Sequence, residues 1–149
     1  MKRIVLYCLI LAGVLLIPVE RTDISSLEPI QAVWMYKDGE NLTLQTDTDD
    51  TGTGRTAQEA LSEMKYHSSG IVYLDTAEFL LVSSSAIEYI AEMKSILKGS
   101  VKICLWEGEG ELSEAAAYMQ AHKTGCRLDQ WQPQVKLPKM PEQTGEKKG

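Results

Sequence analysis

A strand–helix–strand unit at residues 79–106 constrains the fold of this chain most. Residues 79–82 and 101–106 are apolar runs of strand length, and the segment between them carries apolar residues at helical spacing. Such a unit places its two strands parallel in one sheet, with the helix crossing over one face. The chain is therefore expected to fold around a parallel strand pair covered by a helix.

The segments on either side extend this pattern. Residues 30–36 and 41–46 are strand-like and flank Asp38-Gly39, a dipeptide that is a strong signal for an antiparallel hairpin. Two further strands are expected, at 71–74 and within 126–131. Three helices are expected as well, each starting at a capping residue. They run from a capping box at Thr56 to Gly70, from a capping box at Ser85 over 86–97, and from an N-cap at Ser113 to about 122. We predict a single α/β (α+β) domain, a mixed sheet with an N-terminal β-hairpin and about three helices.

The first nineteen residues have a different composition. Lys2 and Arg3 precede the apolar or weakly polar run 4–19, which resembles the n-region and h-region of an export signal. The run does not end in a small-residue cleavage pattern, and Cys8 lies too early for a lipoprotein signal, so a signal anchor is favoured over a cleaved signal peptide. We expect residues 4–19 to contact the membrane as a single pass, with the domain extracytoplasmic by the positive-inside rule.

Composition also divides the rest of the chain. We predict a linker at 20–28, the extracytoplasmic domain at 29–131 and a disordered tail at 132–149. The whole chain has a net charge of −6, but residues 20–131 hold nine basic and nineteen acidic residues. A domain this acidic is repelled by nucleic-acid phosphates, so nucleic acid is not an expected partner.

The polar loop at 47–54 and the start of the next helix carry the candidate ligand-binding residues, which are Asp47, Asp49, Asp50, Gly52, Gly54 and Thr56. The segment 52–57 matches the G-x-G-x-x-A pattern of dinucleotide sites, with Asp75 about twenty residues later. Residues 50–52 spell the Asp-Thr-Gly triplet of aspartic proteases, and 47–52 imitate the start of a calcium loop. The preceding strand is half polar, no second triplet exists, and Gln58 stands where a calcium loop needs glutamate. A solvated loop that enters a capped helix is the simplest interpretation, with small-ligand or calcium binding as the alternative.

No arrangement of residues typical of a catalytic site, a metal centre or a cofactor site stands out. We therefore expect a non-enzymatic protein, with no catalytic residues, metal or cofactor. Cys104 and Cys126 could form a disulfide outside the cytoplasm, or they could be two small buried side chains. Glu107, Glu109 and Glu111 alternate with glycines and form a second acidic loop.

Several segments resemble the N-terminal domain of the Ger(x)C spore-germination family, the C subunit of germinant receptors. Residues 54–60 are similar to the family's G-x-T-x-x-E-A helix entry, and residues 74–82 to its next segment, in which a small polar motif leads into an apolar run. The helix at 86–97 and the strand at 101–106 follow in the family's order. The chain lacks the family's lipobox cysteine and later domains, so the resemblance implies a stand-alone, anchored version of the first domain.

These observations lead to one expectation about function. The chain is expected to be a membrane-anchored, extracytoplasmic interaction domain that binds an envelope or spore-membrane protein. The resemblance implies a link with sporulation or germination in an endospore-forming bacterium. The strands at 30–46 and the acidic loops at 47–52 and 107–111 are the expected contact surface.

Overall fold

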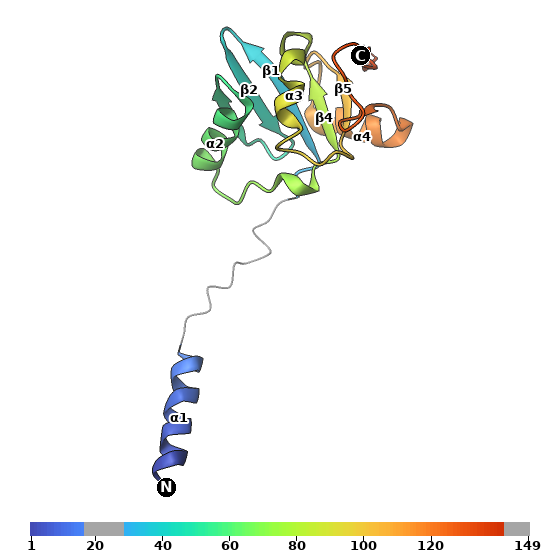
Figure 1. The fold of residues 1–149 in the computed structure, drawn as a ribbon. Coiled ribbons are helices and arrows are strands. Elements are labelled where there is room, and N and C mark those ends of the chain that lie inside the picture. Colours follow the sequence, from blue (N-terminus) through green and yellow to red (C-terminus); the bar gives the residue numbers. More distant parts are fainter. Residues whose placement is uncertain (17–28, 142–149) are drawn as a thin grey trace, which may run out of the picture.

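The computed structural model describes residues 1–16 and 29–141 of the chain. The linker predicted at 20–28 and the last part of the predicted tail, 142–149, lie outside the described residues. The described part contains four α-helices and a six-stranded mixed sheet, which confirms the predicted α/β class. Figure 1 shows helix α1 (Lys2–Leu15) standing apart from the sheet domain.

The sheet is mixed because its central strands are parallel and its outer strands are antiparallel. The strands are β1 (Ala32–Asp38), β2 (Asn41–Thr46), β3 (Thr51–Gly54), β4 (Phe79–Val82), β5 (Lys102–Leu105) and β6 (Cys126–Arg127), in the order β3-β2-β1-β4-β5-β6. The strands β4 and β5 pair in parallel, as the unit at 79–106 predicts, and β1 pairs in parallel with β4. The strands β1 and β2 are antiparallel neighbours, with Gly39 at φ +62° in the turn between them.

Helices cover both faces of the sheet. Helix α2 (Ala57–His67), the 3-10 helix η3 (Ser84–Tyr89) and the short helix α3 (Ile90–Met93) pack on one face, and α4 (Leu112–His122) packs on the other. Side chains alternate along β1, so Val33 and Met35 enter the core under α2 and α3, whereas Ala32 and Trp34 face α4. The domain therefore has two hydrophobic cores, one on each face of the sheet.

Helix α1 is apolar around its whole circumference. None of its residues is buried, and its large apolar side chains are between 56% and 78% exposed. Within residues 1–16 and 29–141, no helix has both the length and the apolar character that crossing a membrane requires.

Two predicted elements differ in the structure. Residues 71–74 form no strand and pair with no other strand of the sheet, although Val72 and Leu74 are buried and Ile71 and Tyr73 are exposed. A 3-10 helix, η2 (Leu74–Thr76), follows. The helix predicted at 86–97 is instead the 3-10 helix η3 followed by one turn of α3.

The serines before this helix explain the second difference. The Ser83 hydroxyl donates to Glu107 at 2.7 Å, and the Ser85 hydroxyl accepts from the backbone N–H of Lys37 at 3.3 Å. Neither side chain caps the helix, since both are bonded to residues of other elements. The capping box that the sequence suggests is therefore not formed, and the segment begins as a 3-10 helix.

The tail prediction is wrong for residues 132–141. Leu137 and Met140 are buried, and Leu105 on the edge of β5 forms a parallel bridge with Lys139. The Leu105 N–H donates to Pro138 O, and the Met140 N–H donates to Leu105 O, both at 2.9 Å. The folded domain therefore extends ten residues beyond the predicted boundary at 131.

Candidate functional site

A hollow of about 340 Å³ lies where the two acidic segments meet. Its wall combines Trp34 and Trp106 with three acidic residues, Asp47, Asp49 and Glu111. Lysine and arginine are absent from this wall, so negative charge there has no basic neighbour within the hollow. We call this hollow the acidic–aromatic pocket.

The aromatic side is built by strand alternation. Trp34 and Trp106 project from β1 and from the end of β5 on the α4 face, with ring centroids 5.0 Å apart and planes at 63°. Tyr36 lies beside Trp34 at 4.1 Å. Gly108, at φ +86°, makes room for the indole, because a Cβ there would lie 2.5 Å from two ring atoms of Trp34. The Trp34 Nε1–H is buried with no hydrogen-bond partner among the described residues.

The acidic side begins with the turn after β2. The Asp50 backbone N–H donates to Thr46 Oγ1 at 3.1 Å, and Thr48 Oγ1 donates to Asp50 Oδ2 at 3.1 Å. Asp49 has φ +66°, which aspartate tolerates better than most residues. The backbone N–H of Gln31 donates to both carboxylate oxygens of Asp47, with its nitrogen 3.2 Å from each. Asp47 is therefore a fixed carboxylate, while Asp49 is exposed and has no side-chain partner among the described residues.

The start of α4 completes the wall. Helix α4 begins at Leu112 with Glu111 as its N-cap residue, so the predicted N-cap Ser113 already lies inside the helix. No side chain caps this end. Ser113 instead lines the pocket with its hydroxyl group available. The pocket thus combines carboxylates and a hydroxyl group with the side chains of Trp34 and Trp106 in its wall.

Gly52 and Gly54 lie outside this pocket and have a structural role. They belong to β3, which the sequence analysis treats as loop, and pair with Leu44 and Leu42 of β2. A Cβ on Gly52 would lie 2.1 Å from Ala60 O, and one on Gly54 would lie 2.5 Å from Ala60 N. Both glycines therefore let α2 approach the edge of the sheet.

Thr56 is the N-cap of α2, as predicted, and accepts the Glu59 N–H at 3.1 Å. The Ala57 N–H donates to the carboxylate of Glu92 on α3 at 2.8 Å, and the Arg55 N–H donates to Glu59 at 2.9 Å. Carboxylates of the chain itself therefore stand at the helix end where a dinucleotide phosphate would bind. The fingerprint residues 52–57 build the packing of α2, and Asp75 lies apart from them as an exposed residue of η2.

The six predicted ligand residues thus separate into two groups. Asp47 and Asp49 line the acidic–aromatic pocket with Glu111 of the second acidic loop. Asp50 stabilises the turn, and Gly52, Gly54 and Thr56 position α2. In the described part of the chain, no three His, Cys, Asp or Glu side chains are grouped so that they could hold a metal ion. The sequence analysis missed Trp34, although its alternation with Val33 and Met35 could have placed it on the other face.

The cysteine pair is not bonded. Cys104 is buried in the core under α4, whereas Cys126 packs against the opposite core, because it pairs with Ile103 rather than with Cys104. Neighbouring residues of a strand point to opposite faces, so a disulfide between Cys104 and Cys126, one of the two alternatives, would have to pass through the sheet. Burial raises the pKa of Cys104 to about 11.

Glu107, from the second acidic loop, links β4 to β5. Partial burial alone would raise its pKa, but hydrogen bonds from Ser83 and Ser84 and the charge of Lys139 outweigh this effect and lower it. A lowered pKa in the folded state means a contribution to stability that is complete above the ordinary pKa of 4.5. This contribution is lost as the pH falls through the folded-state value.

Glu107→Gln is therefore expected to destabilise the domain at pH 7 and to have a smaller effect as the pH falls through 4.5 and below. Urea unfolding across this range measures the difference. Glu109→Gln, an exposed change in the same loop, is the control. An effect of Glu107→Gln that is independent of pH would contradict the assignment.

Comparison of the chain with protein-family models, with curated proteins and with solved structures finds no match. The resemblance of residues 54–60 and 74–82 to the Ger(x)C family therefore stays a prediction. The residues of this chain, above all the acidic–aromatic pocket, carry the functional argument.

Proposed function

We propose that the chain is a membrane-anchored, extracytoplasmic, non-enzymatic interaction domain that binds a basic segment of an envelope protein. The observation that carries the proposal is the acidic–aromatic pocket, where carboxylates of two loops stand beside two indole rings. A lysine or arginine side chain complements both features, through charge-assisted hydrogen bonds and through cation–π contact. The buried Trp34 Nε1–H would donate to a carbonyl of such a segment.

The membrane part of the proposal rests on α1 and on the run 4–19. A helix that is apolar on every side and packs against nothing in the described domain is stable where lipid covers it. Lys2 and Arg3 at its start favour an orientation with the domain outside the cytoplasm. A cell-membrane location through a signal anchor follows. The resemblance to the Ger(x)C family adds a role in sporulation or germination to the proposal.

Binding of a basic peptide tests the pocket. An arginine-containing hexapeptide, added to the intact chain in detergent micelles, is expected to change the fluorescence of Trp34 and Trp106, whereas an acidic hexapeptide is not. Asp49→Asn with Glu111→Gln should weaken this binding about tenfold, the equivalent of about 1.4 kcal/mol. Asp38→Asn with Glu40→Gln removes the same charge at the β1–β2 turn and should have little effect.

Equal weakening of peptide binding by the two double variants would mean that general charge attraction, not the pocket, binds the peptide, and would contradict the proposal.

Location is tested separately, by fractionating bacteria that express the intact chain and by treating spheroplasts with protease. The chain is expected to stay with the membranes and its domain to be digested from outside, and a soluble chain would refute the anchor.

A calcium or small-ligand sensor is the alternative function, and a specific rise in the melting temperature of the chain with calcium would favour it.

A further inference from the structure

A second hollow, of about 480 Å³, lies at the amino ends of the parallel strands β4 and β5. Three lysines stand in its wall: Lys98 from the loop before β5, Lys102 at the start of β5 and Lys123 at the end of α4. Phe79 and Met119 supply apolar surface. We call this hollow the lysine cavity.

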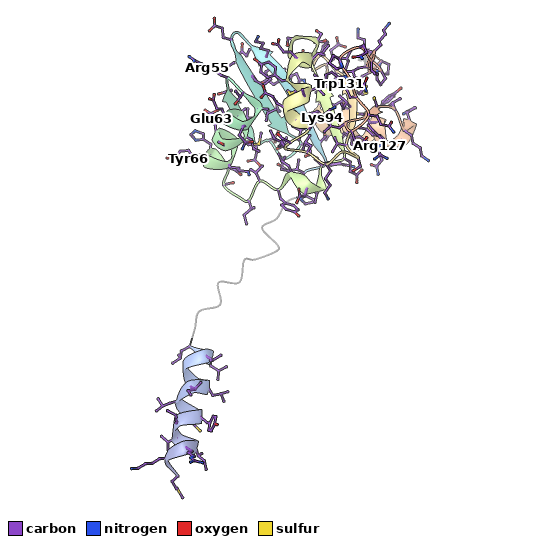
Figure 2. All side chains as sticks on the ribbon, viewed as in Figure 1. Arg55, Glu63, Tyr66, Lys94, Arg127 and Trp131 are labelled. Carbon is purple, nitrogen blue, oxygen red and sulfur yellow. The ribbon has the colours of Figure 1, made fainter. Side chains whose placement is uncertain are left out.

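The three lysines have no ion-pair partner among the described residues. Two other cations form ion pairs, Lys37 with Glu88 at 3.4 Å and Arg127 with Asp129 at 2.7 Å. Arg55, Lys65 and Lys136 form none among the described residues. Lys94 donates to Trp131 O at 2.8 Å, with its ammonium group 5.6 Å from the indole centroid. Figure 2 labels Lys94, Trp131 and Arg127 on the folded domain.

Two acidic residues also line the cavity. The Asp75 carboxylate accepts the hydroxyl hydrogen of Tyr73, a bond that raises the pKa of Tyr73. Glu78 also lines the cavity, directly before β4. The wall therefore has an excess of positive charge, although residues 29–141 carry sixteen acidic and ten basic side chains. An anion is the ligand that this local excess of charge favours.

The position of the cavity indicates which kind of molecule carries the anionic group. The described domain begins beside this cavity, because the Gln31 carbonyl accepts from the backbone N–H groups of Glu78 and Phe79 of the cavity wall at 2.8 and 3.2 Å. The Gln31 side chain also donates to Gln120, another wall residue, at 3.3 Å. Leu16 at the end of α1 and Pro29 are thirteen residues apart. Peptide geometry therefore keeps them within about 45 Å of each other.

We propose that the lysine cavity binds the phosphate group of an anionic phospholipid and so docks the domain on the membrane that holds α1. This inference rests on the proposed anchor. Lysine ammonium groups bind phosphate as point charges, and three of them stand in one cavity here. A domain held in this way turns the edge with the amino ends of β4 and β5 toward the bilayer. The lipid then lies near Lys123 at the end of α4, and the basic segment of the proposed partner lies near Ser113 at its start.

Amine labelling of the intact chain tests the inference without any substitution. The chain is reconstituted into vesicles of phosphatidylcholine, or of phosphatidylcholine and phosphatidylglycerol in equal amounts, and acylated with a reagent that does not cross membranes. Lys98, Lys102 and Lys123 should react several-fold more slowly in the anionic vesicles, while Lys65 and Lys136 should not change. Uniform rates at all five lysines would overturn the inference.

Two further arms separate the explanations. Inorganic phosphate added to the phosphatidylcholine sample should leave the labelling unchanged, and protection by it would show a free phosphate site instead of a lipid site. Flotation of the chain with phosphatidylcholine vesicles tests α1 alone. If the chain floats with neutral vesicles but its three cavity lysines are not protected in anionic ones, only the lipid site is refuted. If the lysines are protected in anionic vesicles but the chain does not float with neutral ones, only the anchor is refuted.

Matched variants measure selectivity. After extraction from the mixed vesicles, the wild-type chain should retain more phosphatidylglycerol than phosphatidylcholine, as mass spectrometry of the bound lipid shows. Lys98→Gln, Lys102→Gln and Lys123→Gln together should abolish this enrichment. Arg55→Gln, Lys65→Gln and Lys136→Gln remove the same charge outside the cavity, with Arg55 on the α2 side in Figure 2, and should preserve the enrichment. Equal loss in both triple variants would contradict a specific site.

Discussion

Replacing Gly52 by alanine is expected to destabilise the domain by about 3 kcal/mol, at the upper end of the usual range for overpacking. The added Cβ would lie 2.1 Å from Ala60 O and 2.5 Å from Met64 N, both backbone atoms of α2. A flexible side chain could move aside, but the helix backbone cannot move without losing the contacts of Leu61 and Met64 with the core. Strand β3 and helix α2 must therefore separate.

Thermal unfolding of the intact chain measures the effect, and a fall in Tm of about 10 °C is expected for a domain of this size. Gly13→Ala provides the same chemical change where nothing lies within 4 Å of the new Cβ, and it should leave the domain transition unchanged. A Gly52→Ala variant as stable as the wild type would show that α2 does not pack on β3 at this distance.

The same glycine explains one limit of the sequence analysis. A glycine-rich segment before a helix occurs in dinucleotide sites and in this edge strand for one stereochemical reason, the close approach of a backbone to a helix. Pattern alone does not distinguish the two uses, and residues 51–54 offer no apolar side chain that would indicate a strand. The apolar runs at 79–82 and 101–106 are different, because their burial on both faces dictates central strands.

The candidate site was predictable in part. Charge density alone identifies the acidic segments around Asp49 and Glu111, but their meeting depends on α4 crossing the sheet face opposite α2. Trp34 became visible as a site residue only when strand order placed it beside Trp106. The lysine cavity was not predictable, since Lys123 at the end of α4 meets Lys98 and Lys102 only because α4 packs across the sheet.

Ending the chain after Trp131 is expected to have a larger effect than any single substitution. The deletion removes the buried side chains of Leu137 and Met140, each of which contributes about 2 kcal/mol by burial. It also removes the two backbone hydrogen bonds to Leu105 and exposes the edge of β5. The sum of about 5 kcal/mol is comparable with the whole stability of many domains, so partial or complete unfolding at 37 °C is expected.

A chain that ends at Pro141 is the matched control, because it keeps every one of these contacts, and its Tm should equal that of the full chain.

The reactivity of the Cys104 thiol, in a Cys8→Ser, Cys126→Ser background, measures the same effect independently. In the full chain Cys104 is 1% exposed, and its thiol donates to Pro138 O at 3.0 Å, so it should resist a thiol reagent at pH 8. Ending the chain at 131 removes Pro138, and rapid reaction of Cys104 is then expected. Equal protection of Cys104 in both truncated chains would mean that residues 132–141 do not cover the sheet edge, and the domain would then end where its sequence composition changes.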